Sequence, residues 1–312
     1  MATAILFPGQ GSQTVGMGAE LFDARPDLLG DAADDVLGWS LRRMCLGGPE
    51  DELTRTEHAQ PALYAVAYAM WDMLRPSLPA PPAAAAGHSL GEYTALAAAG
   101  AVDYLTGLRL VAERGRAMAA AADAEPSGMA ALLGGDTAGA ESLAAARREE
   151  GGRLWVANLN APGQVVVAGG EPDIEWAAEH AAEHGIRRVI PLKVAGAFHS
   201  PYMAPAAERL AAAMEGVDFD TPAFPVWANA TAAPHGSAGA SIASTLVDQL
   251  TSPVRFAESL TAMAASGITT FVHVGPGDVT AGLARKSVEG GEALVASSPS
   301  QVAEVAGALG AS

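Results

Sequence analysis

The pentapeptide Gly87-His88-Ser89-Leu90-Gly91 is the feature that most constrains the fold of this chain. It matches the pattern G-x-S-x-G, which marks a sharp turn from a buried strand into a helix and lifts the serine hydroxyl above its surroundings. Such a turn leaves little room beside the serine, so both flanking positions are glycine. The apolar run 83–86 precedes it and good helix formers occupy 92–99. The sequence predicts a strand–turn–helix unit with Ser89 as a nucleophile, and an ordinary turn is the alternative.

Strand and helix patterns alternate on both sides of this turn. Alternation of this kind predicts a mostly parallel sheet covered by helices, with functional side chains at the carboxyl ends of its strands. The expected strands of this body are 2–7, 83–86, 224–228 and 269–274, and its expected helices are 27–46, 60–75, 92–99, 104–122 (capped by Asp103), 245–250 and 256–265.

The middle of the chain follows a different pattern. Its predicted order is β-α-β-β-α-β, which is the ferredoxin-like unit. We therefore expect a small ferredoxin-like subdomain at 128–195, inserted into a larger α/β body formed by 1–127 and 196–312. The expected strands of the insertion are 128–133, 154–159, 164–169 and 186–193, and its expected helices are 137–150 and 171–184.

Composition narrows the function classes. The formal net charge of −17 disfavours binding to nucleic acid or to anionic membranes. Cys45 is the only cysteine, so no disulfide within the chain is possible, which fits a reducing compartment. The sequence shows no signal peptide and no apolar stretch of about 18 residues. We expect a cytoplasmic, monomeric protein without a metal or cofactor.

A serine nucleophile needs a base, and seven histidines are available. His88 is a poor candidate, because neighbours on a tight turn usually point apart. His180 and His184 are four residues apart, but no third metal ligand lies near them, so we expect them at the surface. His273 ends a strand and is either structural or part of the site. His199 lies in a loop between a strand and a helix, where α/β sites gather functional groups, and it is either the base or structural.

Arg114 lies one helical turn from both Leu110 and Met118, on an apolar stripe. A buried guanidinium is costly without an anionic partner, and its planar fork suits a carboxylate held by two hydrogen bonds. The sequence predicts either a site for a substrate carboxylate, or an internal ion pair or a side chain whose stem is buried while its charged end reaches solvent. Arg109 and Arg116 fall off this stripe and are expected at the surface.

Five motifs, read in order, resemble the malonyl-CoA:acyl-carrier-protein transacylase family over nearly the whole chain. This family includes stand-alone enzymes of fatty-acid synthesis and the acyltransferases of polyketide synthases, and its fold is an α/β-hydrolase-like body with a ferredoxin-like insertion. The motifs are Phe7-Pro8-Gly9-Gln10-Gly11-Ser12-Gln13, Gly87-His88-Ser89-Leu90-Gly91-Glu92-Tyr93, Arg114-Gly115, Asn158-Leu159-Asn160-Ala161-Pro162-Gly163-Gln164 and Phe198-His199-Ser200.

The resemblance implies a role for each catalytic residue. Ser89 is the implied acylated nucleophile and His199 its general base. The backbone N–H groups of Gln10 and Leu90 are the implied oxyanion hole. The backbone carbonyl of Gln249 is implied to hold His199, where a triad uses a carboxylate.

The resemblance also implies the substrate-binding residues. Arg114 is expected to bind the malonyl carboxylate, with His88 and Asn160 also at the substrate site. In the family, a Phe at the position of Phe198 goes with malonyl units and a small residue there with branched units. The commonest fatty-acid enzymes have a small residue at this position, so Phe198 is more typical of polyketide enzymes.

The expected activity is ping-pong transfer of malonyl from malonyl-CoA to the phosphopantetheine thiol of an acyl carrier protein. The sequence leaves three alternative functions open. The chain could instead be a polyketide acyltransferase for another unit such as methylmalonyl, a serine thioesterase or esterase, or a carrier-binding scaffold without activity.

Overall fold

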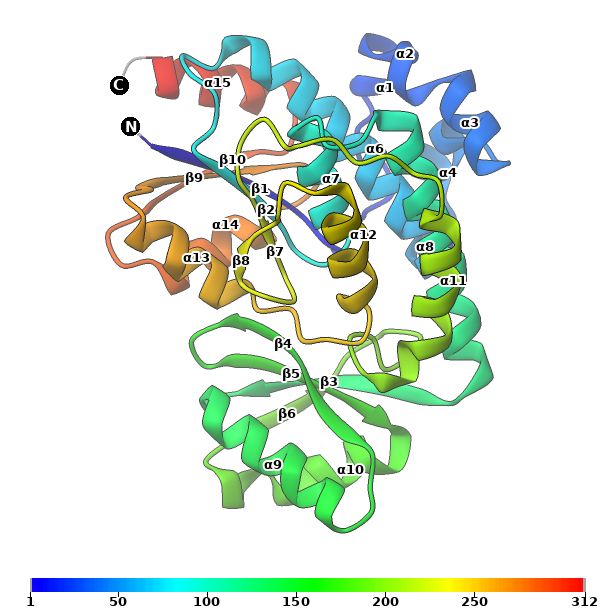
Figure 1. The fold of residues 1–312 in the computed structure, drawn as a ribbon, viewed down its shortest axis with the longest axis vertical. Helices are drawn as coiled ribbons and strands as arrows, with labels where there is room; N and C mark the ends of the chain where they lie inside the picture. Colours follow the sequence, from blue (N-terminus) through cyan, green and yellow to red (C-terminus); the bar gives the residue numbers. More distant parts are fainter. Residues whose placement is uncertain (1, 311–312) are drawn as a thin grey trace.

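The computed structural model describes residues 2–310, in which the strands form two separate sheets (Figure 1). The larger sheet has six strands in the order β10-β9-β1-β2-β7-β8. All neighbouring pairs are parallel except β7 with β8, which is antiparallel at the edge. Its strands are β1 (Thr3–Phe7), β2 (Ala84–Gly87), β7 (Val226–Ala228), β8 (Ala233–Pro234), β9 (Thr270–Val274) and β10 (Glu292–Ala296).

Helices cover both faces of this sheet. Successive side chains of a strand point to opposite faces, and β1 accordingly places Ile5 and Phe7 in one core and Ala4 and Leu6 in another. Residues of α6 and α8 share the first core, and residues of α13 and α14 share the second. The helices of the body are α1 (Leu21–Ala24), α2 (Pro26–Leu29), α3 (Asp31–Leu37), α4 (Leu41–Gly47), α5 (Glu50–Thr54), α6 (Thr56–Leu74), η1 (Arg75–Ser77), α7 (Gly91–Ala98), α8 (Tyr104–Ala124), η3 (Pro201–Met203), α11 (Ala204–Met214), α12 (Gly239–Asp248), α13 (Phe256–Ala265), α14 (Val279–Ser287) and α15 (Pro299–Gly310).

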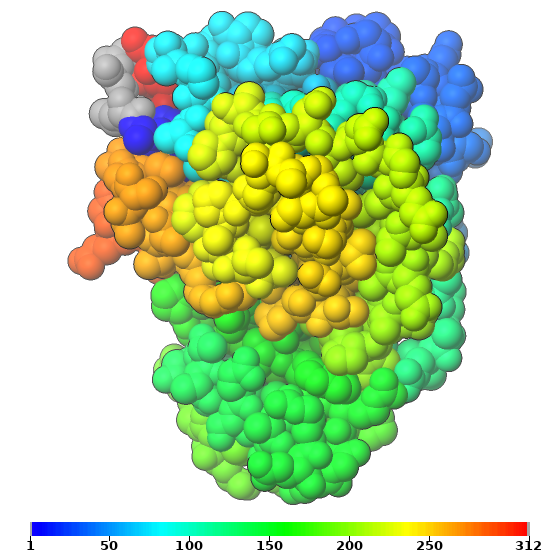
Figure 2. Space-filling view, viewed as in Figure 1, coloured from blue at the N-terminus to red at the C-terminus, as the bar shows by residue number. Residues whose placement is uncertain are grey.

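The second sheet is antiparallel and has its own apolar core. Its strand order, β4-β5-β3-β6, is that of a ferredoxin-like unit, and α9 and α10 lie on one of its faces (Figure 1). In Figure 2 this green segment forms the lower end of the molecule. Its elements are β3 (Ser127–Leu133), α9 (Thr137–Glu149), β4 (Leu154–Ala161), β5 (Gln164–Gly170), α10 (Glu171–His180), η2 (Ala181–His184) and β6 (Arg188–Pro191).

The predicted fold class is therefore confirmed, and the cap predicted at Asp103 is present, because its side chain accepts a hydrogen bond from the Thr106 N–H. The predicted helix 27–46 is wrong. It is three short helices, α2, α3 and α4. Gly30 has a non-helical conformation between α2 and α3, and Gly38 adopts the left-handed conformation after α3, where Ser40 caps a new helix. The predicted helix 245–250 is also misplaced, since α12 ends before Gln249.

Three elements near the C-terminus, α14, β10 and α15, were not predicted. Strand β10 is an edge strand whose residues are mostly half-buried, so its apolar alternation is weak. No helix among residues 2–310 is long and apolar enough to cross a membrane.

Candidate active site

Ser89 occupies the turn between β2 and α7 with a φ of 52°, in the left-handed region. A Cβ on Gly87 would lie 1.8 Å from the backbone carbon of Gly91, and one on Gly91 would lie 2.5 Å from the carbonyl oxygen of Phe7. Both glycines are therefore required by close backbone contacts, as the sequence predicts. The Asn229 side chain accepts from the Ser89 N–H at 2.6 Å and donates to the Gly87 carbonyl at 2.8 Å, which holds a strained turn in place.

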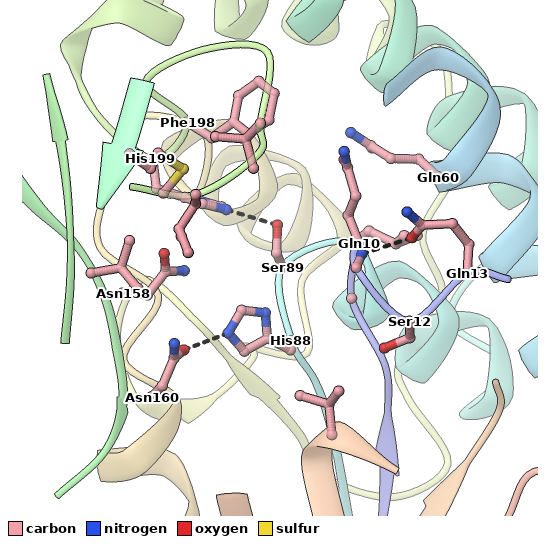
Figure 3. A pocket seen from close by; sticks show the side chains of 18 of the residues that line it. Gln10, Ser12, Gln13, Gln60, His88, Ser89, Asn158, Asn160, Phe198 and His199 are labelled. Atoms are coloured by element: carbon pink, nitrogen blue, oxygen red, sulfur yellow. Dashed lines mark hydrogen bonds between the residues drawn. The ribbon is translucent and has the colours of Figure 1, made fainter. Parts of the chain in front are cut away.

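His199 is the histidine that contacts the serine hydroxyl. Its Nε2 lies 2.7 Å from Ser89 Oγ, as Figure 3 shows, and its Nδ1 lies 2.9 Å from the Gln249 carbonyl oxygen. A carbonyl oxygen can only accept, so Nδ1 carries the proton and Nε2 presents a lone pair to the Ser89 hydroxyl. This tautomer is the one that a base acting on Ser89 requires.

The Gln249 carbonyl is free to hold His199 because of the residue four positions later. In a continuing helix this oxygen would accept the N–H of residue 253, but that residue is Pro253, which has none. Helix α12 ends at Asp248. The local sequence thus supplies a buried acceptor for an imidazole without using a carboxylate.

The side chain of Arg114, on α8, also reaches the Ser89 hydroxyl, and this residue is 1% exposed. Its Nη2 donates to Ser89 Oγ and to Gln249 Oε1, both at 2.9 Å, and its Nη1 donates to Gln60 Oε1 at 2.6 Å. The guanidinium carbon also lies 5.5 Å from the centre of the Tyr93 ring.

These contacts leave the Arg114 charge without a direct counter-ion. All three hydrogen-bond acceptors are neutral, Nε has no hydrogen-bond partner, and no carboxylate of residues 2–310 is within ion-pair distance. Burial lowers the pKa of the guanidinium, which reports the cost of holding it there. The alternative of an internal ion pair is therefore wrong, and a buried cation faces the nucleophile.

The cavity at this point has a volume of about 250 Å³ and lies between the two sheets. Figure 3 shows Phe198 and His199 on one side of Ser89, and Gln10 and Gln60 on the other. Its lining includes Gln10, Gln60, His88, Ser89, Leu90, Arg114, Met129, Asn158, Asn160, Phe198 and His199.

Two backbone donors at the cavity are unused. The N–H groups of Gln10 and Leu90 donate no hydrogen bond within the described residues. Gly9 permits the approach of the Gln10 loop, since a Cβ there would lie 2.5 Å from the His88 carbonyl oxygen. His88 itself does not contact the Ser89 hydroxyl, and its Nε2 lies 2.7 Å from Asn160 Oδ1.

The other histidines lie elsewhere. His180 stacks on Trp176 and His184 bonds Ser142, while His273 is buried and bonds Thr280 and the turn that follows β9. No group of three metal-ligating side chains occurs among the described residues.

A model of the acyl transferase domain matches residues 5–310. The chain belongs to the acyl transferase family. One relative of this acyl transferase is the malonyl CoA-acyl carrier protein transacylase of Bacillus subtilis, 43% identical over 91% of this chain and 89% of that protein. Another is a polyketide biosynthesis malonyl CoA-acyl carrier protein transacylase of Bacillus velezensis, 41% identical over 89% of this chain and 94% of that one.

A solved complex extends the comparison to structure. It contains a type II polyketide synthase acyl-carrier protein with its malonyl-transacylase, and a chain of it superposes with a TM-score of 0.92 at 35% identity. The match covers 99% of this acyl transferase and 100% of that chain.

The structure brings together all nine predicted site residues, although the role of each stays a prediction. Sequence reasoning missed Gln60, Asn229 and Glu92. Asn229 directly follows β7, a position where parallel sheets gather functional groups, and Glu92 directly follows the pentapeptide. Gln60 lies within the long helix α6, where no sequence signal marks it.

Burial of His199, and then the charge of Arg114, lower the pKa of this imidazole from 6.5 to about 3. In the folded protein His199 is therefore neutral at every pH above about 4. We expect kcat/KM for acylation by an acyl-CoA to stay flat from pH 8 down to pH 5, measured as CoA released in the first turnover. An acidic limb near pH 6.5 would contradict this.

The same shift has a consequence for stability. The unfolded chain takes up a proton near pH 6.5, whereas folded His199 takes one up only near pH 3. Its contribution to the free energy of unfolding is therefore full above pH 6.5 and lost as the pH falls towards 3.

Proposed function

We propose that this acyl transferase moves a malonyl group from malonyl-CoA to the phosphopantetheine thiol of an acyl carrier protein. The observation that carries the proposal is Arg114, a buried cation that lies 2.9 Å from Ser89 Oγ and has no carboxylate of residues 2–310 at ion-pair distance. An acyl group bound to Ser89 and bearing a carboxylate supplies the missing anion. The names of the relatives support the same substrate and carrier.

The proposed reaction has two half-reactions. Ser89 Oγ attacks the thioester carbon while His199 Nε2 takes the hydroxyl proton, and the Gln10 and Leu90 N–H groups stabilise the oxyanion. The carbon–sulfur bond then breaks, and His199 returns the proton to the leaving CoA sulfur. The carrier thiol next attacks the malonyl-serine ester, His199 accepts the thiol proton, and that proton goes back to Ser89 Oγ as the ester bond breaks.

Substrate binding changes the electrostatics of the base. Arg114 is a cause of the lowered pKa of His199. A malonyl carboxylate paired with Arg114 cancels that charge, so the pKa of His199 rises in the complex and the imidazole becomes a stronger base. An acyl group without a carboxylate does not produce this change.

The ester must survive until the carrier arrives. An ion pair between Arg114 and the malonyl carboxylate fixes the orientation of the ester, away from a geometry that suits attack by water. His88 and Asn160, which bond each other at the cavity wall, are proposed to bind substrate beside it. A thioesterase would have no use for a buried cation at this point.

The test is a panel of acyl-CoAs followed by intact-mass measurement of the protein. We expect a malonyl adduct on Ser89 with malonyl-CoA, little adduct with acetyl-CoA, and loss of the adduct when a loaded carrier forms. Hydrolysis of malonyl-CoA faster than transfer to the carrier would favour a thioesterase. An adduct with methylmalonyl-CoA as abundant as with malonyl-CoA would favour the branched-unit alternative.

Phe198 is proposed to select malonyl over methylmalonyl. Its side chain is buried and lines the cavity next to His199 (Figure 3). We expect Phe198→Ser to lower the malonyl preference by about 10- to 100-fold, since one methyl group in an apolar pocket is worth roughly 1–3 kcal/mol. The measurement is the ratio of kcat/KM for the two acyl-CoAs, and an unchanged ratio would remove Phe198 from this role.

We place the reaction in the cytoplasm, because a chain with one cysteine can form no internal disulfide and this fits a reducing compartment. We also propose that 1–127 with 196–312 form the catalytic subdomain and 128–195 the smaller one, whose strands β4 and β5 contribute Asn160 and Val166 to the cavity.

A further inference from the structure

A carboxyl group and an imidazole lie buried behind the serine turn, and the proposed reaction uses neither. They belong to Glu92, on α7, and His235, which follows β8. Both side chains are 0% exposed, and His235 Nε2 lies 2.7 Å from Glu92 Oε1. Neither residue lines the cavity. Two polar groups held out of water at this place are costly, so their contacts indicate what they do.

The Gln249 side chain links this pair to the cavity. Its Nε2 donates to the Ser89 carbonyl at 3.0 Å and to Glu92 Oε2 at 2.6 Å, while its Oε1 accepts from Arg114 Nη2 at 2.9 Å. The Ser89 carbonyl can only accept, so the NH₂ group faces it and the oxygen faces Arg114. Glu92 is a second acceptor for the same NH₂ group and opposes rotation of the amide.

Glu92 is held in turn by two further contacts. Its Oε2 accepts from the Asn229 N–H at 2.9 Å, and its Oε1 faces His235. The other ring nitrogen of His235, Nδ1, is buried without a hydrogen-bond partner among the described residues. His235 thus makes its one side-chain hydrogen bond to Glu92, so its polar contact serves that carboxyl group alone.

We propose that Glu92 and His235 form a positioning pair, which orients the Gln249 amide and through it the Arg114 fork, and so sets the selection of carboxylate-bearing acyl groups. The pair touches no substrate and acts through Gln249. This inference rests on the proposed function, because it requires Arg114 to bind the acyl carboxylate. It predicts that substitutions in the pair lower kcat/KM for malonyl-CoA more than kcat/KM for acetyl-CoA.

The experiment compares kcat/KM for malonyl-CoA and acetyl-CoA, measured as CoA released in the first turnover. This ratio does not depend on how much of a preparation is folded. We expect His235→Leu and Glu92→Gln each to lower the malonyl-to-acetyl ratio by about tenfold or more, as when a buried hydrogen-bonding partner is lost. His235→Gln keeps a donor for Glu92 and is expected to stay within about threefold of the wild-type ratio. Glu258→Gln, at an exposed ion pair with Arg255, is the control and is expected to change nothing.

The outcomes separate the inference from the proposed function. A lower Tm with an unchanged ratio in both His235→Leu and Glu92→Gln would show a purely structural pair and overturn the inference alone. Failure of His235→Gln to restore the ratio would also overturn it. Wild-type protein that shows no preference for malonyl-CoA would overturn the proposed function, and this inference with it.

Discussion

Replacing Ser89 by Ala is expected to remove the covalent adduct and to lower malonyl transfer by at least about 10⁴-fold, the scale at which loss of a nucleophile acts in serine enzymes. His199→Ala is expected to lower the rate by about 10²- to 10⁴-fold, the usual contribution of a general base. The double variant should be no slower than Ser89→Ala, because two groups that act as one unit are lost together. The measurements are intact mass after exposure to malonyl-CoA and the steady-state rate of carrier loading.

The chain offers a matched control for this pair. His184 Nδ1 lies 3.0 Å from Ser142 Oγ at the exposed surface of the smaller sheet's helical layer, so Ser142→Ala and His184→Ala break a similar contact away from the cavity. We expect neither to change the rate. An adduct that persists in Ser89→Ala would place the nucleophile elsewhere and end the proposed mechanism.

The serine turn shows why part of the site could be predicted from sequence. Its demands are local: a strand, two glycines in close backbone contact and a helix, all within about fifteen consecutive residues. The position of Arg114 on an apolar stripe is equally local, because helical periodicity alone fixes it. The ferredoxin-like order also follows from consecutive elements, and these parts of the prediction are confirmed.

What could not be predicted depends on distant pairs. Gln249, which follows α12, meets Ser89, Arg114 and Glu92 only in the folded chain, and no pattern near residue 249 encodes those contacts. The helix predicted at 27–46 failed for a different reason, since its apolar spacing is compatible with one helix and the backbone conformations of Gly30 and Gly38 break it. The family resemblance implied the contact between His199 and the Gln249 carbonyl, but nothing in the sequence indicated that the Gln249 side chain also bonds Glu92.

Arg114→Ala is expected to convert a malonyl-selective enzyme into an unselective one. We expect kcat/KM for malonyl-CoA to fall by about 10²- to 10³-fold, since loss of one partner of a buried charge pair costs roughly 2–5 kcal/mol. The value for acetyl-CoA should hold or rise, because Ser89 Oγ loses a hydrogen-bond donor and the pKa of His199 moves back up once that cation is gone. The measurement is first-turnover CoA release with both substrates, with Arg109→Ala, an exposed position on the same helix, as the control.

Stability gives an independent check on the same variant. A buried guanidinium whose acceptors are all neutral costs desolvation that nothing in the free protein offsets fully. We therefore expect the Tm of Arg114→Ala to equal or exceed that of the wild type, although malonyl transfer falls. A large drop in Tm together with equal losses for malonyl-CoA and acetyl-CoA would mean that Arg114 holds the fold together and does not select the acyl group. A selective loss without a drop in Tm would mean that the protein keeps an unpaired cation in its interior because the substrate supplies the anion.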